Sequence, residues 1–137
     1  MKNTVYDCSI VQLPKIIDIS GSITSVNNSQ EIPFGIERVY YLYDVPGGEA
    51  RGGHGHKELQ QLIVAASGSF NITIDDGCVK RTFFLSRPSH GLYLPRGLWR
   101  ELSDFSSGAI CLVLASHVYD ESDYIREYNE FKKYKNG

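Results

Sequence analysis

The sequence predicts an all-β domain, a sandwich or barrel, that ends in one short helix. Short runs rich in β-branched and aromatic residues alternate with turn residues along most of the 137 residues. Many short strands at such spacing are typical of sandwiches and barrels. The predicted strands cover residues 6–13, 23–26, 37–45, 58–66, 68–74, 80–85, 91–94, 99–105 and 109–115.

Two local signals add detail to this prediction. Asp76 and Gly77 stand between two alternating runs, which predicts a tight β-hairpin there. Only the C-terminal region has a helical period, because Tyr124, Tyr128 and Phe131 recur on one helix face. With a cap at residue 120 or 122, the pattern predicts a helix from about residue 123 to 134.

Composition indicates one domain over residues 1–137, long enough to bury its own core. The net charge of −2 does not favour a general binder of nucleic acid or of membrane surfaces. Cys8, Cys78 and Cys111 are odd in number and far apart, so neither a disulfide framework nor a thiolate zinc site is expected. With no apolar signal segment, the sequence predicts a soluble cytoplasmic protein.

Residues 51–56, Arg-Gly-Gly-His-Gly-His, carry the strongest chemical signal. In a strand, residues i and i+2 point to the same face, so His54 and His56 are expected side by side. Two adjacent imidazoles can bind a metal ion or exchange protons near neutral pH. A pair that only makes structural hydrogen bonds is the third alternative.

The same stretch resembles the first motif of the cupins, a superfamily of small β-barrels. In that motif a His-x-His pair precedes a glutamate, a position that falls here on Gln60 or Gln61. The second cupin motif, Pro-x-Gly-x-x-His, corresponds to residues 95–100, with Arg100 in place of its histidine. In metal-binding cupins, three histidines and the glutamate hold one ion.

These replacements disfavour a metal. A guanidinium stays protonated and has no lone pair to offer, and a neutral amide replaces the anionic ligand. His90 and His117 lie outside both motifs. We therefore predict no metal and no cofactor. Free of a metal, His54 and His56 would do acid–base work while Arg100 stabilises a developing oxyanion, an arrangement suited to enolisation beside a carbonyl. An ion pair between Arg100 and Glu101, or another nearby acid, is the structural alternative.

Over nearly its whole length the chain resembles the sugar 3,4-ketoisomerases of the FdtA/QdtA type, also called WxcM-like. The tail over residues 119–126, Tyr-Asp-Glu-Ser-Asp-Tyr-Ile-Arg, is highly specific when combined with the His-x-His pair. The segments that carry the resemblance are residues 32–41, 51–57, 61–64, 67–69, 91–93, 99–101, 104–107, 113–116 and 119–126.

The resemblance implies an RmlC-like cupin jelly roll and an isomerase of dTDP-sugar metabolism. Such an enzyme moves the ketone of dTDP-4-keto-6-deoxyglucose from C4 to C3 through an enediol, with no redox cofactor. We assign the C3 proton to His54 or His56; the other histidine, a nearby tyrosine or water serves the C4 side, and Arg100 steadies the enediolate. The resemblance also implies a homodimer, commonly with exchanged N-terminal strands.

Four further residues are candidates for binding the dTDP-sugar. Arg38 and Arg51 are expected to bind the diphosphate, because planar guanidinium donors match phosphate oxygens. Tyr41 and Gln61 are expected to hold the sugar or the nucleotide. Alternation puts Tyr41 on the face of its strand opposite to Arg38 and Tyr40, and core or rim packing would also explain these tyrosines.

Three rival functions stay open. A dTDP-sugar 3,5-epimerase would act on the same nucleotide sugar in a metal-free barrel with a histidine base. A non-catalytic cupin would only bind or sense the nucleotide sugar. A metal-dependent dioxygenase is disfavoured by Gln60, Gln61 and Arg100, which replace the metal ligands.

Overall fold

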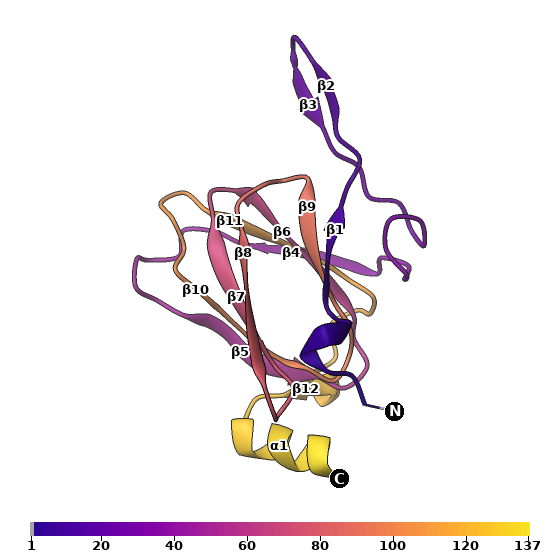
Figure 1. Cartoon of the computed structure of the whole chain (residues 1–137), viewed down its shortest axis with the longest axis vertical. Helices are drawn as coiled ribbons and strands as arrows, with labels where there is room; N and C mark the ends of the chain where they lie inside the picture. The colour runs from indigo at the N-terminus through magenta and orange to yellow at the C-terminus, as the bar shows by residue number, and fades with distance from the viewer. Residues whose placement is uncertain (1) are drawn as a thin grey trace.

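A computed structural model describes residues 2–137, and two five-stranded antiparallel sheets enclose its core (Figure 1). The first sheet has the order β1 (Ser9–Gln12), β9 (His90–Leu94), β6 (Gln61–Ser67), β11 (Ile110–Ala115), β4 (Arg38–Leu42). The second has the order β12 (Tyr124–Ile125), β5 (Arg51–His56), β10 (Trp99–Ser103), β7 (Phe70–Asp75), β8 (Lys80–Leu85). The all-β prediction is therefore confirmed.

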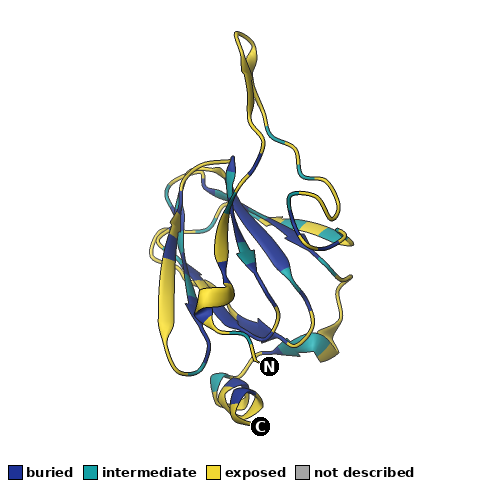
Figure 2. Ribbon diagram, turned by 45° about the vertical axis from the view of Figure 1, so that its right-hand side comes forward, coloured by how far each residue is buried: buried dark blue, intermediate teal, exposed yellow. Residues whose placement is uncertain are grey.

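The core lies between the inner faces of the two sheets. Ile63 and Val113 contribute from the first sheet, and Ile72 and Leu102 contribute from the second; all four are fully buried. Burial alternates with exposure along strands that face solvent on one side, as β4 shows. Figure 2 shows this as dark blue segments lining the interior of the barrel. The packing follows from the period of two in the strand sequences.

The predicted hairpin at residues 76–77 is confirmed. β7 and β8 pair antiparallel along their full lengths on either side of it. The carboxylate of Asp76 accepts hydrogen bonds from the backbone N–H groups of Cys78 and Val79, both at 2.9 Å. Gly77 has φ of +92°, a conformation that a residue with a side chain rarely adopts.

The predicted C-terminal helix begins later than expected. Residues Glu121–Asp123 form a 3₁₀ turn, η2, which Asp120 caps by accepting from the N–H of Ser122 at 3.0 Å. The next two residues form β12, which pairs with the free edge of β5, and the helix α1 runs only over Tyr128–Asn136. Strand pairing at the edge of β5 has overridden the helical pattern of residues 123–127. In α1, Phe131 is fully buried against Trp99 and Ile125.

A hairpin arm, β2 (Ile16–Asp18) with β3 (Gly21–Ile23), projects away from the barrel. The sequence predicts one strand over residues 23–26 in this region. That prediction is wrong, because the strands here are β2 and β3, and β3 ends at Ile23. The isoleucines of the arm are exposed, at positions 16, 17, 19 and 23. A 3₁₀ turn, η1 (Val5–Asp7), precedes β1. Among residues 2–137, no helix is long and apolar enough to cross a membrane.

Candidate active site

The two histidines of β5 lie side by side, as their spacing predicts. His54 and His56 are 9% and 4% exposed, and their ring centroids are 4.9 Å apart. Gly55 between them faces the other side of the strand. A Cβ added there would lie 3.1 Å from the carbonyl oxygen of Leu98 and 3.3 Å from Phe131, so the glycine lets α1 pack closely behind the histidines.

Arg100 of β10 is the register partner of His54 in the neighbouring strand. Its side chain is 2% exposed, and its Nη2 lies 3.0 Å from the hydroxyl of Tyr40 and 3.2 Å from Nε2 of His54. A guanidinium only donates, so Nε2 of His54 accepts, and the ring proton is assigned to Nδ1. Glu101 is exposed and does not pair with Arg100, so the structural alternative for Arg100 is wrong.

His54 and Arg100 open into a pocket of about 330 Å³ at one end of the barrel. His56 is not part of its lining and lies behind His54. The pocket is lined by Arg38, Tyr40, Leu42, Arg51, Gly52, Gly53, His54, Arg100, Tyr124 and Arg126. Four arginines in so small a pocket suit an anionic ligand. A larger hollow of about 530 Å³, at the base of the hairpin arm, contains none of these groups.

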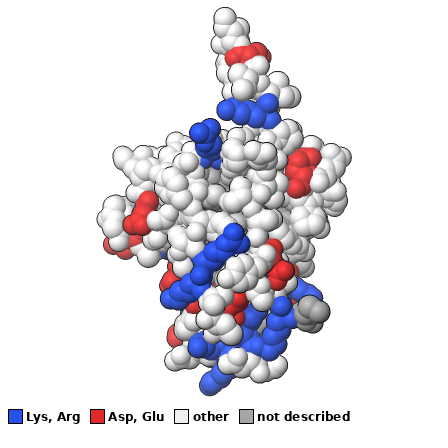
Figure 3. Space-filling model, viewed as in Figure 1, with Lys and Arg blue, Asp and Glu red and all other residues white. Residues whose placement is uncertain are grey.

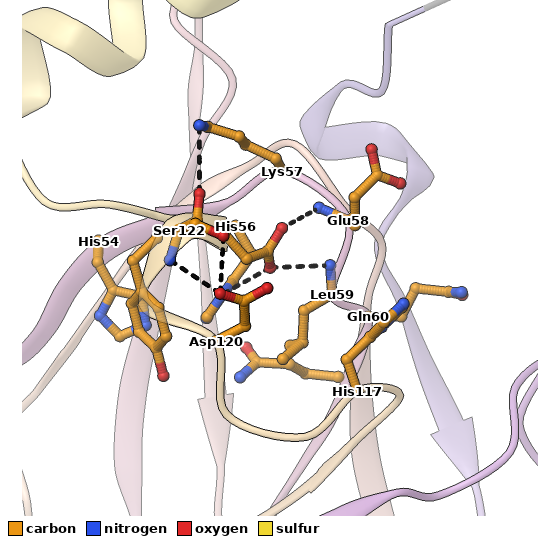
Figure 4. Close-up of polar contacts among 12 residues, drawn as sticks. His54, His56, Lys57, Glu58, Leu59, Gln60, His117, Asp120 and Ser122 are labelled. Carbon is orange, nitrogen blue, oxygen red and sulfur yellow. Dashed lines mark hydrogen bonds and ion pairs between the residues drawn. The ribbon is translucent and has the colours of Figure 1, made fainter.

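The tail segment forms one wall of the site. The ring of Tyr124 lies against both histidines, with centroid separations of 5.0 Å from His54 and 4.4 Å from His56. Its hydroxyl accepts from Nη1 of Arg38 at 3.4 Å. On the same segment, an oxygen of Asp123 lies 3.3 Å from Nδ1 of His56. Figure 4 shows Asp120 and Ser122 of this segment beside His56 and the residues that follow β5.

Two arginines at the pocket mouth have different partners. The guanidinium of Arg126 lies 4.3 Å from the centroid of the Tyr124 ring and makes a two-point contact with Glu121, at 2.7 and 2.8 Å. The guanidinium of Arg38 lies over the rings of Tyr40 and Tyr119, at 4.5 and 5.1 Å. Both arginines line the pocket, and neither is deeply buried.

Burial and the neighbouring arginines keep both histidines neutral. Burial, followed by the charge of Arg100, lowers the pKa of His54 from 6.5 to about 2. The same two causes lower the pKa of His56 to about 3, with Arg38 and Arg126 adding to the effect. At neutral pH each ring therefore has one lone pair with which to accept a proton, as a general base requires.

This burial of neutral histidines predicts a loss of stability in acid. Below pH 6.5 the unfolded chain binds protons that the folded chain excludes, so stability falls as pH drops, by up to about 1.4 kcal/mol per pH unit for each histidine. Urea unfolding between pH 7.5 and 5 measures the slope. We expect a shallower slope in a His54→Asn/His56→Asn double variant, and the wild-type slope in the exposed control His117→Asn. Equal slopes in all three proteins would contradict this origin.

The four predicted binding residues lie in different places. Arg38 and Arg51 line the pocket, at its mouth. Gln61 is buried behind it and reaches the site by donating from Nε2 to the Tyr40 hydroxyl at 2.9 Å. Tyr41 does not reach the site, contrary to expectation: it is 59% exposed and its ring lies against Tyr43 on the outer face of β4. Tyr40, on the opposite face, stands in the pocket instead.

Sequence reasoning missed Tyr40, Asp123, Tyr124 and Arg126 as site residues. For Tyr40 the signal was present, because alternation puts it on the same strand face as Arg38. For the other three the signal is the tail motif over residues 119–126, which is specific to the family but has no alternation that would place its side chains at the pocket. Among residues 2–137, no group of three or more His, Cys, Asp or Glu side chains is placed to hold a metal ion.

The chain matches the family model described as "FdtA: WxcM-like, C-terminal" over residues 6–136. The chain belongs to the FdtA family. Over 125 residues this FdtA-family chain is 46% identical to the TDP-4-oxo-6-deoxy-alpha-D-glucose-3,4-oxoisomerase of Aneurinibacillus thermoaerophilus, covering 91% of this chain and 90% of the relative. The resemblance identified in the sequence is therefore confirmed.

Solved structures agree with this membership. A 3,4-ketoisomerase from Helicobacter canadensis superposes on the FdtA-family chain with a TM-score of 0.93 and 42% identity, over 96% of this chain and 98% of that one. The QdtA 3,4-ketoisomerase of Thermoanaerobacterium thermosaccharolyticum, solved with TDP, gives 0.94 and 37%, over 97% of each chain. A variant of QdtA has been solved with TDP-4-keto-6-deoxyglucose.

The fold extends beyond the family. A dTDP-4-dehydrorhamnose 3,5-epimerase from Bacillus anthracis superposes with a TM-score of 0.76 at 18% identity, over 89% of this chain and 79% of that one. At that identity the likeness concerns the fold alone. The RmlC-like cupin barrel predicted from the sequence is confirmed for this FdtA-family chain.

Proposed function

We propose that this chain is a 3,4-ketoisomerase that moves the ketone of dTDP-4-keto-6-deoxyglucose from C4 to C3. The observation that carries the proposal is the pairing of a neutral His54 with the buried cation of Arg100 in one pocket. A base beside a fixed positive charge suits proton removal next to a carbonyl. The 46% identical relative is named for this reaction, and the chain covers 90% of it.

The geometry favours His54 over His56 as the base that meets the sugar, because only His54 lines the pocket. As Arg100 moves its Nη2 from Nε2 of His54 to the C4 oxygen of the sugar, Nε2 is freed and takes the proton from C3. Electrons move toward the C4 oxygen, giving an enediolate whose charge Arg100 stabilises. The isomerisation is completed when the proton on the C3 oxygen passes to the C4 oxygen and the proton taken from C3 is returned to C4, so that a C3 ketone and a C4 hydroxyl result. No electron is gained or lost overall.

Tyr40 is the tyrosine best placed to assist this transfer. Its hydroxyl oxygen receives hydrogen bonds from Gln61 at 2.9 Å and from Arg100 at 3.0 Å. Since both partners donate, the hydroxyl's own hydrogen is available to a ligand oxygen in the pocket. Gln61 acts in this proposal through Tyr40, and it need not contact the sugar itself.

The charged mouth supports binding of a nucleoside diphosphate. Arg38 and Arg51, the predicted diphosphate ligands, lie at the pocket with Arg126. Guanidinium groups pair with phosphate oxygens through two parallel donors. The sugar would then extend past the mouth toward His54, so that the charged end of the ligand stays near solvent.

One assay tests the proposal. The protein is incubated with dTDP-4-keto-6-deoxyglucose in D₂O with a chelator, and the product is followed by NMR. We expect the ketone to move to C3. Deuterium at C3 and C5 without ketone movement would indicate an epimerase, no change would indicate a binding protein, and loss of turnover in chelator would contradict the metal-free site.

We also propose that the chain forms a homodimer through the hairpin arm and the first sheet, in the cytoplasm. The arm exposes four isoleucines, and few charged side chains lie along it (Figure 3). The hollow at its base is lined largely by apolar side chains, including Leu13, Val64 and Leu114. A projecting apolar arm and an apolar hollow on one chain suit a two-fold dimer. Three unpaired cysteines suit the cytoplasm.

A charge on the arm is expected to separate the dimer. Sedimentation should give a dimer for the wild type and a monomer for an Ile17→Asp/Ile19→Asp variant, because burying those carboxylates without partners is costly. The control is Phe84→Asp, which places a charge on an exposed apolar residue of β8. A wild-type monomer, or a dimer in the arm variant, would contradict the proposal.

A further inference from the structure

His56 is a buried titratable residue that makes no direct contact with the sugar in the proposed reaction. It is 4% exposed and lies behind His54, outside the pocket lining. Its ring is held on one side by Tyr124, at 4.4 Å, and meets His54 edge-on. What His56 does depends on which of its two ring nitrogens carries the proton.

Asp123 faces Nδ1 of His56 from a fixed position. Its two carboxylate oxygens accept from the backbone N–H groups of Glu58 at 2.8 Å and Leu59 at 3.2 Å, just beyond the end of β5 (Figure 4). Its own carbonyl oxygen accepts from the N–H of Lys57 at 3.0 Å. The second of those carboxylate oxygens is the one that lies 3.3 Å from Nδ1 of His56.

We propose that Asp123 is a positioning residue that holds His56 in the tautomer with its proton on Nδ1. An ionised carboxylate only accepts hydrogen bonds, so a neutral imidazole beside it is favoured with Nδ1–H directed at the oxygen. Nε2 of His56 then keeps its lone pair. Both ring nitrogens of His56 are buried, and neither makes a well-directed hydrogen bond among residues 2–137. The Asp123 oxygen at 3.3 Å from Nδ1 is therefore the contact that distinguishes the two nitrogens.

The consequence for the reaction rests on the proposed function. When His54 holds the proton from C3, the site contains two positive charges, those of His54 and Arg100, and beside them a lone pair on Nε2 of His56 is favoured over an N–H. The other tautomer would turn an N–H toward the barrel interior and leave a lone pair facing the carboxylate, which is repulsive. Asp123 therefore does not contact the sugar, and it influences the reaction only by fixing the tautomer of His56.

The test compares Asp123→Asn with the wild type by imidazole ¹⁵N NMR and by kinetics. The asparagine of this variant keeps an oxygen for the shorter bond, from the N–H of Glu58 at 2.8 Å, by giving up the bond from the N–H of Leu59 at 3.2 Å. Its NH₂ group then faces Nδ1, which favours a proton on Nε2. We expect Nδ1–H in the wild type and Nε2–H in the variant, with kcat lower by roughly tenfold or more and KM changed less than about threefold. A His56→Asn variant lacks the imidazole ¹⁵N signals of His56, and comparison with the wild type therefore identifies them.

Asp120→Asn is the matched control. Asp120 lies on the same segment and caps η2 through Ser122, and no contact joins it to either histidine in the described chain. It should keep the wild-type tautomer and kcat. A wild-type His56 protonated on Nε2 overturns the inference, as does an Asp123→Asn variant with unchanged tautomer and kcat. If the variant does not fold, the wild-type spectrum decides. If the wild type is inactive on the keto sugar, the spectra still decide the tautomer, so this inference and the proposed function fail separately.

Discussion

His54→Asn should reduce kcat/KM for the keto sugar by roughly 10²-fold or more, because it removes the one imidazole in the pocket lining. The arginines at the mouth are untouched, so the variant should bind TDP as the wild type does. Turnover by NMR and TDP affinity by calorimetry measure the two quantities. In D₂O the variant should leave the C3 proton of the sugar in place.

The control for this variant is His117→Asn. His117 is exposed and contacts only the hydroxyl of Ser116 within the described chain, so its loss should leave both measurements unchanged. Normal turnover in His54→Asn would remove His54 from the reaction. Loss of TDP affinity together with turnover would show instead that the histidine holds the pocket in shape.

Arg100→Met should separate activity from stability. Turnover should fall by about 10²- to 10³-fold, because the donor that meets the developing oxyanion is lost. Yet the guanidinium is 2% exposed, pairs with no carboxylate of residues 2–137, and has Nε and Nη1 without hydrogen-bond partners there. Replacing such a group by an apolar side chain of similar length should leave the free energy of unfolding unchanged or raise it by about 1 kcal/mol.

Urea unfolding and the NMR assay measure these opposite effects. Arg100→Lys is the matched comparison, since it keeps the charge but loses the fork that reaches Tyr40 and His54 together. It should be less stable than Arg100→Met and recover only part of the turnover. A large drop in stability for Arg100→Met would show that Arg100 is structural, and unchanged turnover would exclude it from the reaction.

The sequence predicts the strands of the barrel well because their period of two is imposed by burial on one side. The same period places His54 and His56 side by side, whereas Arg100 is predicted by the resemblance of residues 95–100 to the second cupin motif. The structure brings the two motifs together on adjacent strands, β5 and β10. Alternation alone does not say which face of a strand is the inner one. This is why the sequence predicts Tyr41 as a ligand-binding residue, whereas Tyr40 lines the pocket. Arg38 and Tyr41 lie on opposite faces of β4.

The predictions for residues 123–134 and for the hairpin arm are wrong for a different reason, which is that these segments are shaped by pairing with distant partners. Tyr124 and Ile125 are a strand only because β5 offers an edge to pair with. No local pattern in residues 123–134 distinguishes that outcome from a helix. The arm is a hairpin of three residues on each side, too short for a clear alternation. In both cases the deciding partner lies elsewhere in the chain or, for the arm, in the second copy that we propose.

The pairing of β12 with β5 has a consequence for biosynthesis. The wall of the pocket that Tyr124 and Arg126 form is translated about 70 residues after the histidines it covers. A nascent chain that has folded its barrel as far as β11 would hold His54 and Arg100 in place with one side of the pocket still open. On the ribosome, the barrel can therefore form before the enzyme does, and catalytic competence arrives only when residues 124–126 emerge and β12 pairs with β5.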